Sequence, residues 1–151
     1  MVRQDIFTNT AVALDTILQE QLPLLLQTND WQSKYRSLMQ LGKLLPTLPD
    51  ELKRDELKVR GCESQFWLVH YKDTATQRHY WAFDSDARII KGLACILICQ
   101  LNGLPSSQLQ LAQAEQLLAT LQLAQNLSPS RNNGLYAVLE KIKVQAGVNP
   151  S

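Results

Sequence analysis

One cysteine of this sequence lies in a setting that favours reaction over packing. Cys62 directly follows Gly61, and its other near neighbours, Arg60, Glu63 and Ser64, are polar. Glycine allows backbone turns that a β-substituted residue resists, so we expect Cys62 on an accessible turn. The thiolate of such a cysteine is a nucleophile and a metal ligand. We therefore interpret Cys62 as the reactive residue, against the alternative of a small buried hydrophobe.

The charges beside Cys62 act on its thiol in opposite directions. A free cysteine has a pKa of about 8.5, which Arg60 would lower and Glu63 would raise. The sequence leaves this balance open. An attacking thiol works best with a pKa near the ambient pH, so a modestly tuned cysteine suits sulfur exchange.

The other two cysteines, Cys95 and Cys99, are four residues apart in an apolar helical run. We expect both to pack in the core, because binding zinc would require them to leave a buried helix face. The sequence contains no C-x-x-C or H-x-x-x-H pattern, no P-loop and no G-x-G-x-x-G. We therefore predict no metal site and no cofactor.

Two histidines, His70 and His79, are the only candidates for the base of a hydrolytic cysteine site. Both fall in predicted strands beside aromatic residues, and neither has an obvious orienting partner. Either could approach Cys62, but we interpret them as hydrogen-bonded strand residues. An independent thiol enzyme is accordingly the least favoured function, and we do not expect the chain to be an enzyme by itself.

A β-hairpin is the element that must position Cys62. Residues 66–71 and 79–83 are rich in aromatic and branched side chains, and a polar turn separates them. A short strand over 58–60 could extend the pair to a small antiparallel sheet of about three strands.

Two helices are expected before the hairpin. The first covers 8–26, where Pro23 should break it, since proline inside a helix costs about 3 kcal/mol. The second covers 31–45 after the N-cap candidates Asn29–Asp30. Its Trp31–Tyr35 pair is predicted to belong to the core.

The strongest helix start is Asp84-Ser85-Asp86, three cap-forming residues before an apolar run that ends at Asn102–Gly103. This helix is apolar nearly all round, so we expect it to be the buried one. Gly92 lies in its middle and suggests close packing of another element. Asp86 is predicted to cap it. For Ser85, capping is weighed against a second hypothesis, in which the helix N-terminus steadies a sulfur anion near Cys62.

The remaining segments complete the expected order of elements. A solvated connector covers 50–58, a short helix starts at 104–107, and a Gln-rich helix covers 112–123. A loop over 126–133 precedes a last helix that buries Leu135, Val138, Leu139 and Ile142. Helices, then a small sheet, then helices indicate an α+β fold, and we expect residues 1–151 to form one domain.

Composition excludes several classes of protein. The 151 residues carry a net charge of +1, so nothing indicates nucleic acid or an anionic membrane as a partner. The longest apolar run is far shorter than the roughly 20 residues of a membrane span. No export signal is visible, and an odd number of cysteines does not make a disulfide framework. We expect a reducing cytoplasmic location, with an organellar stroma or matrix as the alternative.

Four motifs together resemble the SufE family of sulfur acceptors for cysteine desulfurases. They occur in the family's order between Trp31 and Ala146 and are specific in combination. Phe66 departs from the pattern, because a smaller aliphatic residue is expected there, and its bulk could alter the packing under the cysteine loop. The motifs are Val59-Arg60-Gly61-Cys62-Glu63-Ser64-Gln65-Phe66-Trp67; Trp31-Gln32-Ser33-Lys34-Tyr35-Arg36-Ser37-Leu38 with Leu41-Gly42-Lys43-Leu44-Leu45-Pro46; Asp84-Ser85-Asp86-Ala87-Arg88-Ile89-Ile90-Lys91-Gly92-Leu93; and Leu127-Ser128-Pro129-Ser130-Arg131-Asn132-Asn133-Gly134-Leu135.

The resemblance implies a fold and a mechanism. The fold would be a small antiparallel sheet packed by helices, shared with iron–sulfur scaffold proteins of the IscU type. Cys62 would take the outer sulfur from the persulfide of a pyridoxal-phosphate cysteine desulfurase. It would pass that sulfur to an iron–sulfur scaffold or another acceptor, and so stimulate the desulfurase. The loop would lie against the body of the free protein and swing out on docking.

The resemblance also implies roles for individual residues. Cys62 would be the persulfide site, and Arg131, otherwise a solvated loop cation, would position the loop or the desulfurase. Two rival functions remain: an iron–sulfur or zinc scaffold that uses all three cysteines, and an allosteric desulfurase partner that carries no sulfur. The residues assigned to the sulfur loop and to partner docking are Arg60, Gly61, Glu63, Ser64, Ser85, Asp86 and Arg131.

Overall fold

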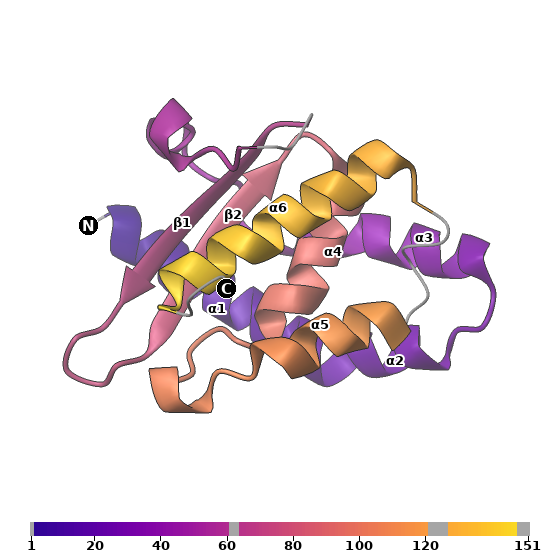
Figure 1. Cartoon of the computed structure of the whole chain (residues 1–151), viewed down its shortest axis with the longest axis horizontal. Helices are drawn as coiled ribbons and strands as arrows, with labels where there is room; N and C mark the ends of the chain where they lie inside the picture. Colours follow the sequence, from indigo (N-terminus) through magenta and orange to yellow (C-terminus); the bar gives the residue numbers. More distant parts are fainter. Residues whose placement is uncertain (1, 61–63, 121–126, 148–151) are drawn as a thin grey trace.

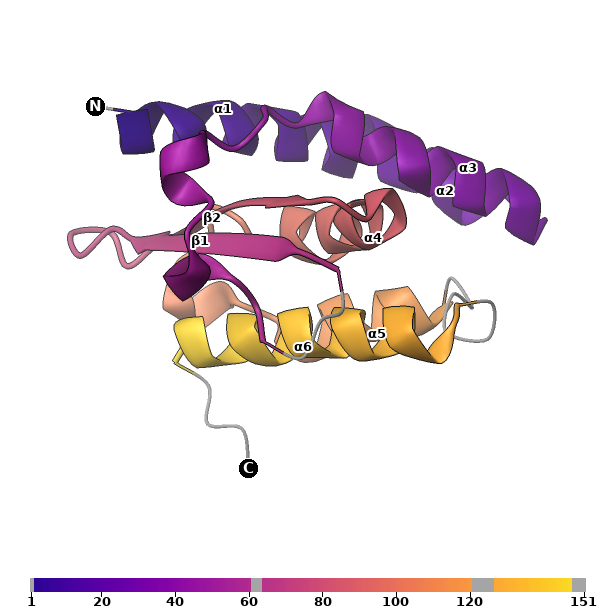
Figure 2. The ribbon, with the colours of Figure 1, turned by 90° about the horizontal axis from the view of Figure 1, so that it is seen from above.

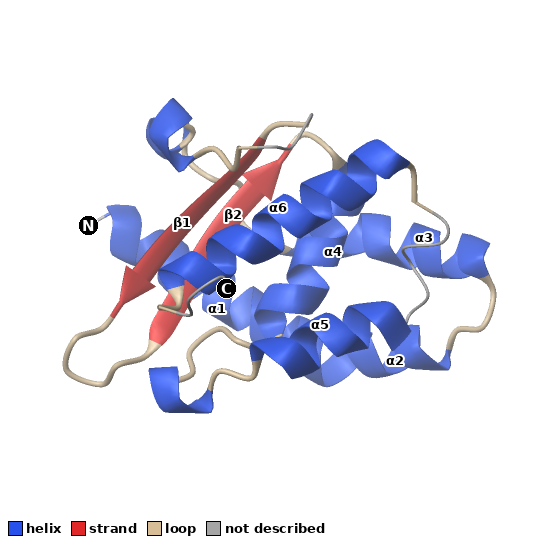
Figure 3. Ribbon diagram, in the orientation of Figure 1, coloured by secondary structure: helices blue, strands red, loops and turns tan. Residues whose placement is uncertain are grey.

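Three layers of secondary structure make up the part of the chain that the computed structural model describes, residues 2–60, 64–120 and 127–147. Figure 2 shows the N-terminal helices in one layer, a β-hairpin with α4 in the middle, and α5 with α6 in the third. The helices and strands are α1 (Val2–Thr16), α2 (Leu22–Gln27), α3 (Trp31–Leu41), β1 (Phe66–Lys72), β2 (His79–Ser85), α4 (Arg88–Cys99), α5 (Leu111–Thr120) and α6 (Pro129–Gln145). This arrangement confirms the predicted α+β fold (Figures 1 and 3).

The predicted hairpin is confirmed. β1 and β2 pair antiparallel, from Phe66 opposite Ser85 at one end to Lys72 opposite His79 at the other. The expected third strand shrinks to one isolated bridge between Lys58 and Trp67, so the described sheet has two strands. Its neighbours in sequence form short 3-10 turns at Asp50–Leu52 and Asp55–Leu57, which leave only this bridge to pair with β1.

Each face of the hairpin is covered by a different set of helices. On one face, the side chains of β1 and β2 join those of α4 and α6 in the main core, and Phe66 is fully buried. Phe66 stacks on Phe83 with ring centroids 5.9 Å apart, so the core accommodates the larger side chain at this position. On the other face, Trp67 and Val69 pack against Ile6 and Phe7 of α1.

α4 is the central helix, as its all-round apolar pattern predicts. Ten of its residues are buried, including Cys95 and Cys99. A Cβ atom at Gly92 would overlap the backbone carbonyl oxygen of Leu38. The prediction that another element packs closely at Gly92 is therefore confirmed: α3 crosses α4 there, and only glycine leaves room for its backbone.

The predicted break at Pro23 is wrong. The backbone stays helical from α1 to α2 through a π-helical segment, Ile17–Gln21, and Pro23 lies in the first turn of α2. Proline lacks a backbone N–H and crowds the preceding turn. The π turn just before Pro23 changes the hydrogen-bond pattern of that turn, so the helix accommodates the proline. The helix therefore continues past Pro23 with a locally changed backbone hydrogen-bond pattern and does not end there.

Two predicted helix starts are misplaced. β2 continues through Ser85, and α4 begins only at Arg88 with Ala87 as N-cap and no side-chain capping bond. α6 begins at Pro129, inside the predicted loop, because Ser128 caps it by accepting a hydrogen bond from the Arg131 amide and proline suits the first turn. The N-cap of α3 is as expected: Asp30 accepts a hydrogen bond from the Ser33 amide.

Candidate functional site

The base of the cysteine loop is closed by backbone pairing. Gly61, Cys62 and Glu63 lie outside the described residues, so the structure locates the site through its flanks. The Val59 amide donates to the Phe66 carbonyl oxygen at 2.8 Å, beside the Lys58–Trp67 bridge. Val59 and Phe66, which flank the Cys62 motif, are therefore paired side by side at the sheet edge. Arg60 is exposed and Ser64 half-buried on the two sides of the described gap.

Gln65 is held at both its backbone groups by Ser85, the last residue of β2, and by Asp86, which follows it. Its N–H donates to Oδ1 of Asp86 at 2.9 Å. Its carbonyl oxygen accepts from the Ser85 hydroxyl at 2.7 Å and from the Asp86 amide at 3.2 Å. We call this arrangement of Gln65, Ser85 and Asp86 the Gln65 clasp. It fixes the chain three residues after Cys62.

The prediction that Asp86 caps α4 is wrong, and of the two hypotheses for Ser85 the capping one also fails, because Ala87 is the N-cap and no side chain in the described part of the chain caps the helix. The Ser85 hydroxyl accepts from the Ala87 amide, and the Asp86 amide is already donating to Gln65. Both side chains therefore serve the link to Gln65, which lies about twenty residues earlier in the chain. The Asp84-Ser85-Asp86 motif marked Ser85 and Asp86 as important polar residues. Local spacing could not show that their partner is Gln65.

Asp84 is a buried carboxylate directly before the clasp. Its Oδ1 accepts from the Ser85 amide at 2.8 Å and lies 2.9 Å from Nζ of Lys91. Its Oδ2 accepts from the Leu48 amide at 3.2 Å and lies 3.7 Å from Nζ of Lys53. Burial alone would raise the pKa of Asp84, but Lys91 and the two amides outweigh burial and hold that pKa below its usual value. Asp84 was not predicted as a site residue.

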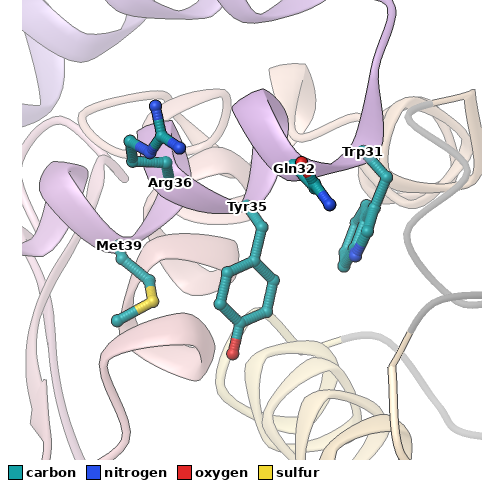
Figure 4. A pocket seen from close by; sticks show the side chains of 5 residues that line it. All are labelled: Trp31, Gln32, Tyr35, Arg36 and Met39. Carbon is teal, nitrogen blue, oxygen red and sulfur yellow. The ribbon is translucent and has the colours of Figure 1, made fainter.

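Arg131 lies in the first turn of α6 and contacts α3. Its Nη1 donates to the Tyr35 hydroxyl at 3.1 Å. Tyr35 belongs to a hollow of about 450 Å³ on α3, whose lining side chains are Trp31, Gln32, Tyr35, Arg36 and Met39. Figure 4 shows Trp31, Tyr35 and Met39 extending from one side of α3, with Tyr35 pointing toward the pale yellow helix α6.

The prediction that Trp31 and Tyr35 are core residues holds only in part. Both pack against the core and touch edge to face at 5.4 Å, but both are half-buried and line this hollow. Their spacing together with Met39 marked one face of a helix. It did not reveal that the face remains partly open.

The two histidines are hydrogen-bonded strand residues, as predicted. Nε2 of His70 lies 2.8 Å from Nδ1 of His79, and Nε2 of His79 lies 2.7 Å from the Ser106 hydroxyl. Both rings stack near Trp81. Burial lowers the pKa of both imidazoles, to about 4 for His70; His79 adds to the effect at His70, and Lys72 adds to it at both. His70 is four strand residues beyond Phe66, or about 13 Å along β1, away from the cysteine loop.

Cys95 and Cys99 are core residues, as predicted. Burial raises the pKa of both thiols, to about 12 for Cys99, so neither forms a thiolate near neutral pH. Among residues 2–60, 64–120 and 127–147, no three or more His, Cys, Asp or Glu side chains are grouped to hold a metal ion. Within the same described ranges, no helix is both long and apolar enough to cross a membrane.

Comparison with known proteins connects these features to a family. The model of the SufE family, described as an Fe-S metabolism associated domain, matches residues 19–146. The chain is 37% identical over 122 residues to an uncharacterized SufE-like protein of Rhizobium etli, which covers 80% of this chain and 82% of the relative. It is 37% identical over 133 residues to the sulfur acceptor protein CsdE of Escherichia coli, covering 88% and 87%.

A third relative is longer than this chain. SufE-like protein 1 of Arabidopsis thaliana, named chloroplastic/mitochondrial, is 39% identical over 129 residues, which are 85% of this chain but 34% of the relative. The family match covers most of the sequence and includes the cysteine loop, the clasp and Arg131. The chain therefore belongs to the SufE family.

Proposed function

We propose that this chain accepts sulfur from a pyridoxal-phosphate cysteine desulfurase, stimulates that enzyme, and carries the sulfur on Cys62. The observation that carries the proposal is the family match over 19–146 together with the burial of the other two cysteines. The relative in Escherichia coli is named a sulfur acceptor protein. Since Cys95 and Cys99 have raised pKa values inside α4, Cys62 is the candidate thiol for exchange.

The transfer step requires only thiol chemistry. The Cys62 thiolate attacks the outer sulfur of the persulfide on the desulfurase. A new S–S bond forms at Cys62 while the S–S bond of the donor breaks, and the donor cysteine leaves as a thiolate that takes up a proton. The transferred sulfur keeps its oxidation state, so the step needs no external oxidant or reductant.

The described surroundings of Cys62 suit a loop that is anchored at its base. The Val59–Phe66 hydrogen bond and the Gln65 clasp hold the two ends, while Arg60, Gly61, Glu63 and Ser64 form the segment around the thiol. Arg131, bound to Tyr35 beside the hollow on α3, is assigned to docking of the desulfurase. Replacement of Arg131 by alanine should weaken the stimulation of the desulfurase, and unchanged stimulation would exclude this role.

The onward acceptor is an iron–sulfur scaffold or another thiolation protein. A reducing compartment, the cytosol or an organellar stroma or matrix, would keep Cys62 available as a thiol. Nucleic acid and membranes are not part of this function. The family description, Fe-S metabolism, supports iron–sulfur cluster assembly as the destination of the sulfur.

Intact mass spectrometry tests the proposal. After incubation with a desulfurase and cysteine, the chain should gain the mass of one sulfur atom, mapped to Cys62. Cys62→Ser should abolish the gain, whereas the matched control Cys95→Ala should retain it. A wild-type chain that gains no sulfur on Cys62 contradicts the proposal. Stimulation that persists in Cys62→Ser would instead favour an allosteric partner without sulfur carriage. Loss of the gain in Cys95→Ala would favour the three-cysteine scaffold.

A further inference from the structure

The Gln65 clasp adjoins a buried ion pair between Asp84, near the end of β2, and Lys91 of α4. We propose that Asp84 and Lys91 form a positioning pair for the Cys62 segment: their ion pair fixes the Ser85–Asp86 turn, and this turn holds Gln65. The role in sulfur transfer rests on the function proposed above, whereas the effect on Gln65 does not.

Asp84 joins three separate parts of the chain at one carboxylate. It accepts from the Leu48 amide, which follows α3, and it pairs with Lys53 from the connector and with Lys91 from α4. It also accepts from the amide of Ser85, its own neighbour. The last bond orients the Ser85 backbone, while the other three hold the carboxylate against fixed structure.

Lys91 is the dominant cationic partner of Asp84. The Asp84–Lys91 contact is 2.9 Å with both side chains at least 87% buried, whereas Lys53 lies at 3.7 Å and its side chain is 28% exposed. The stem of Lys91 runs over Gly42, where an added Cβ would come within 2.9 Å of Lys91 Cδ. Packing of the Lys91 stem against Gly42 thus holds the ammonium group next to the Asp84 carboxylate.

The consequence is a rigid connection from α4 to the cysteine loop. Lys91 fixes Asp84, Asp84 fixes the Ser85 amide, and the Ser85 hydroxyl and Asp86 carboxylate bind the Gln65 backbone. Both ions are needed, because a buried charge without its partner has no favourable site in the interior. Asp84 and Lys91 therefore act on Cys62 through Gln65 without having to touch it.

Amide hydrogen exchange measured by NMR tests the positioning role directly. In Asp84→Asn and Lys91→Met, the Gln65 amide should exchange at least tenfold faster than in the wild type. Lys91→Arg keeps the charge and should restore exchange to within about threefold. The matched control is Lys143→Met, which removes the partner of Glu115 and Glu140 on α5 and α6 and should leave Gln65 unchanged.

A merely structural ion pair would give a different pattern. If the pair only stabilises the fold, its removal would accelerate exchange at a core amide of α4 such as Leu97, which exchanges through global unfolding. Exchange at the Gln65 amide would then stay unchanged. That result overturns the proposal. If a single variant does not fold, the double variant Asp84→Asn with Lys91→Met leaves no unpaired charge from this pair. Wild-type exchange at Gln65 in that folded double variant also overturns it.

The link to sulfur transfer is a separate measurement. Asp84→Asn should form the Cys62 persulfide at least fivefold more slowly with a desulfurase and cysteine, and Lys91→Arg should stay within twofold of the wild type. Equal rates in all variants overturn the role in transfer. If the wild type forms no persulfide, the proposed function fails, while the Gln65 exchange rates still decide whether the pair positions the loop.

Discussion

The two ends of the β-hairpin are built on opposite electrostatic principles. At the end where β1 begins and β2 finishes, the buried group is a charged carboxylate, Asp84, neutralised by Lys91. At the other end lie two imidazoles, the half-buried His70 and the buried His79, which bond to each other, and His79 also bonds to Ser106. The same two strands therefore carry an ionic anchor near the cysteine loop and a neutral stack near the turn.

The difference shows how burial acts on acids and bases. Burial disfavours charge at both ends, but Asp84 has a cation and two amides that outweigh it, so its pKa falls and it stays ionised. Within the described part of the chain no carboxylate pairs with His70 or His79, and Lys72 lies nearby, so their pKa values fall and they stay neutral. The ionic end suits a precise anchor, while the neutral end joins the two strands through hydrogen bonds and ring stacking.

Removing the ionic anchor should have the largest effect on stability. Asp84→Ala leaves Lys91 without its main partner in a largely buried site, and breaking such a pair costs about 3 kcal/mol or more. Urea unfolding of the variant and of the wild type measures this loss. A loss below about 1 kcal/mol would show that Lys91 reaches solvent in the variant and that the Asp84–Lys91 pair is not an important anchor of this end of the hairpin.

Acid should weaken the neutral end first. Because the folded pKa of His70 is lowered to about 4 from 6.5, the folded and unfolded states are both neutral above pH 6.5, and stability is full there. Below pH 6.5 His70 binds a proton in the unfolded chain but not in the folded one, so the free energy of unfolding falls until about pH 4. The full pKa difference would give a loss of about 2.5 kcal/mol by pH 4.5, and because His70 is only half-buried we expect about 1 to 2 kcal/mol.

The control for this pH profile is His70→Gln, which keeps a polar side chain that does not titrate. It should make the profile shallower between pH 6.5 and 4.5, with a remaining slope from His79, whose pKa is also lowered. Asp84, whose pKa is lowered from 3.8, loses its contribution only below that range, so the two ends separate by pH. An equally steep profile in His70→Gln would contradict the assignment to the histidine end.

Two serines provide a smaller, paired comparison. Ser106→Ala removes the hydroxyl partner of the buried His79 and should cost about 1 to 2 kcal/mol. Urea unfolding at pH 7.5 measures it. Retention of wild-type stability would mean that water replaces the hydroxyl at His79.

Ser85→Ala should have the smallest effect on global stability, less than about 1 kcal/mol, because Gln65 is exposed and water can replace the lost hydroxyl. Its effect should instead be local, as faster amide exchange at Gln65. A global loss larger than that of Ser106→Ala would reverse the order predicted for the two ends.

Local patterns in the sequence were enough for the main elements. The hairpin, the buried α4 and the core positions of Cys95 and Cys99 follow from aromatic strands and an all-round apolar helix, and both signals arise from neighbours in the chain. Gly92 in the middle of the helix likewise predicted a close contact, although only the structure shows that its partner is the Leu38 carbonyl oxygen. The motif around Cys62 and the family resemblance indicated the candidate thiol.

The tertiary structure decided what the polar residues do. Asp84, Ser85 and Asp86 read locally as three helix caps, yet Asp84 meets the Leu48 amide 36 residues away and Asp86 meets the Gln65 amide 21 residues away. A cap is a short-range bond that spacing can predict, whereas these bonds depend on which segments the packed core brings together. The sequence by itself thus indicated the thiol, and only the fold shows how the chain beside it is held.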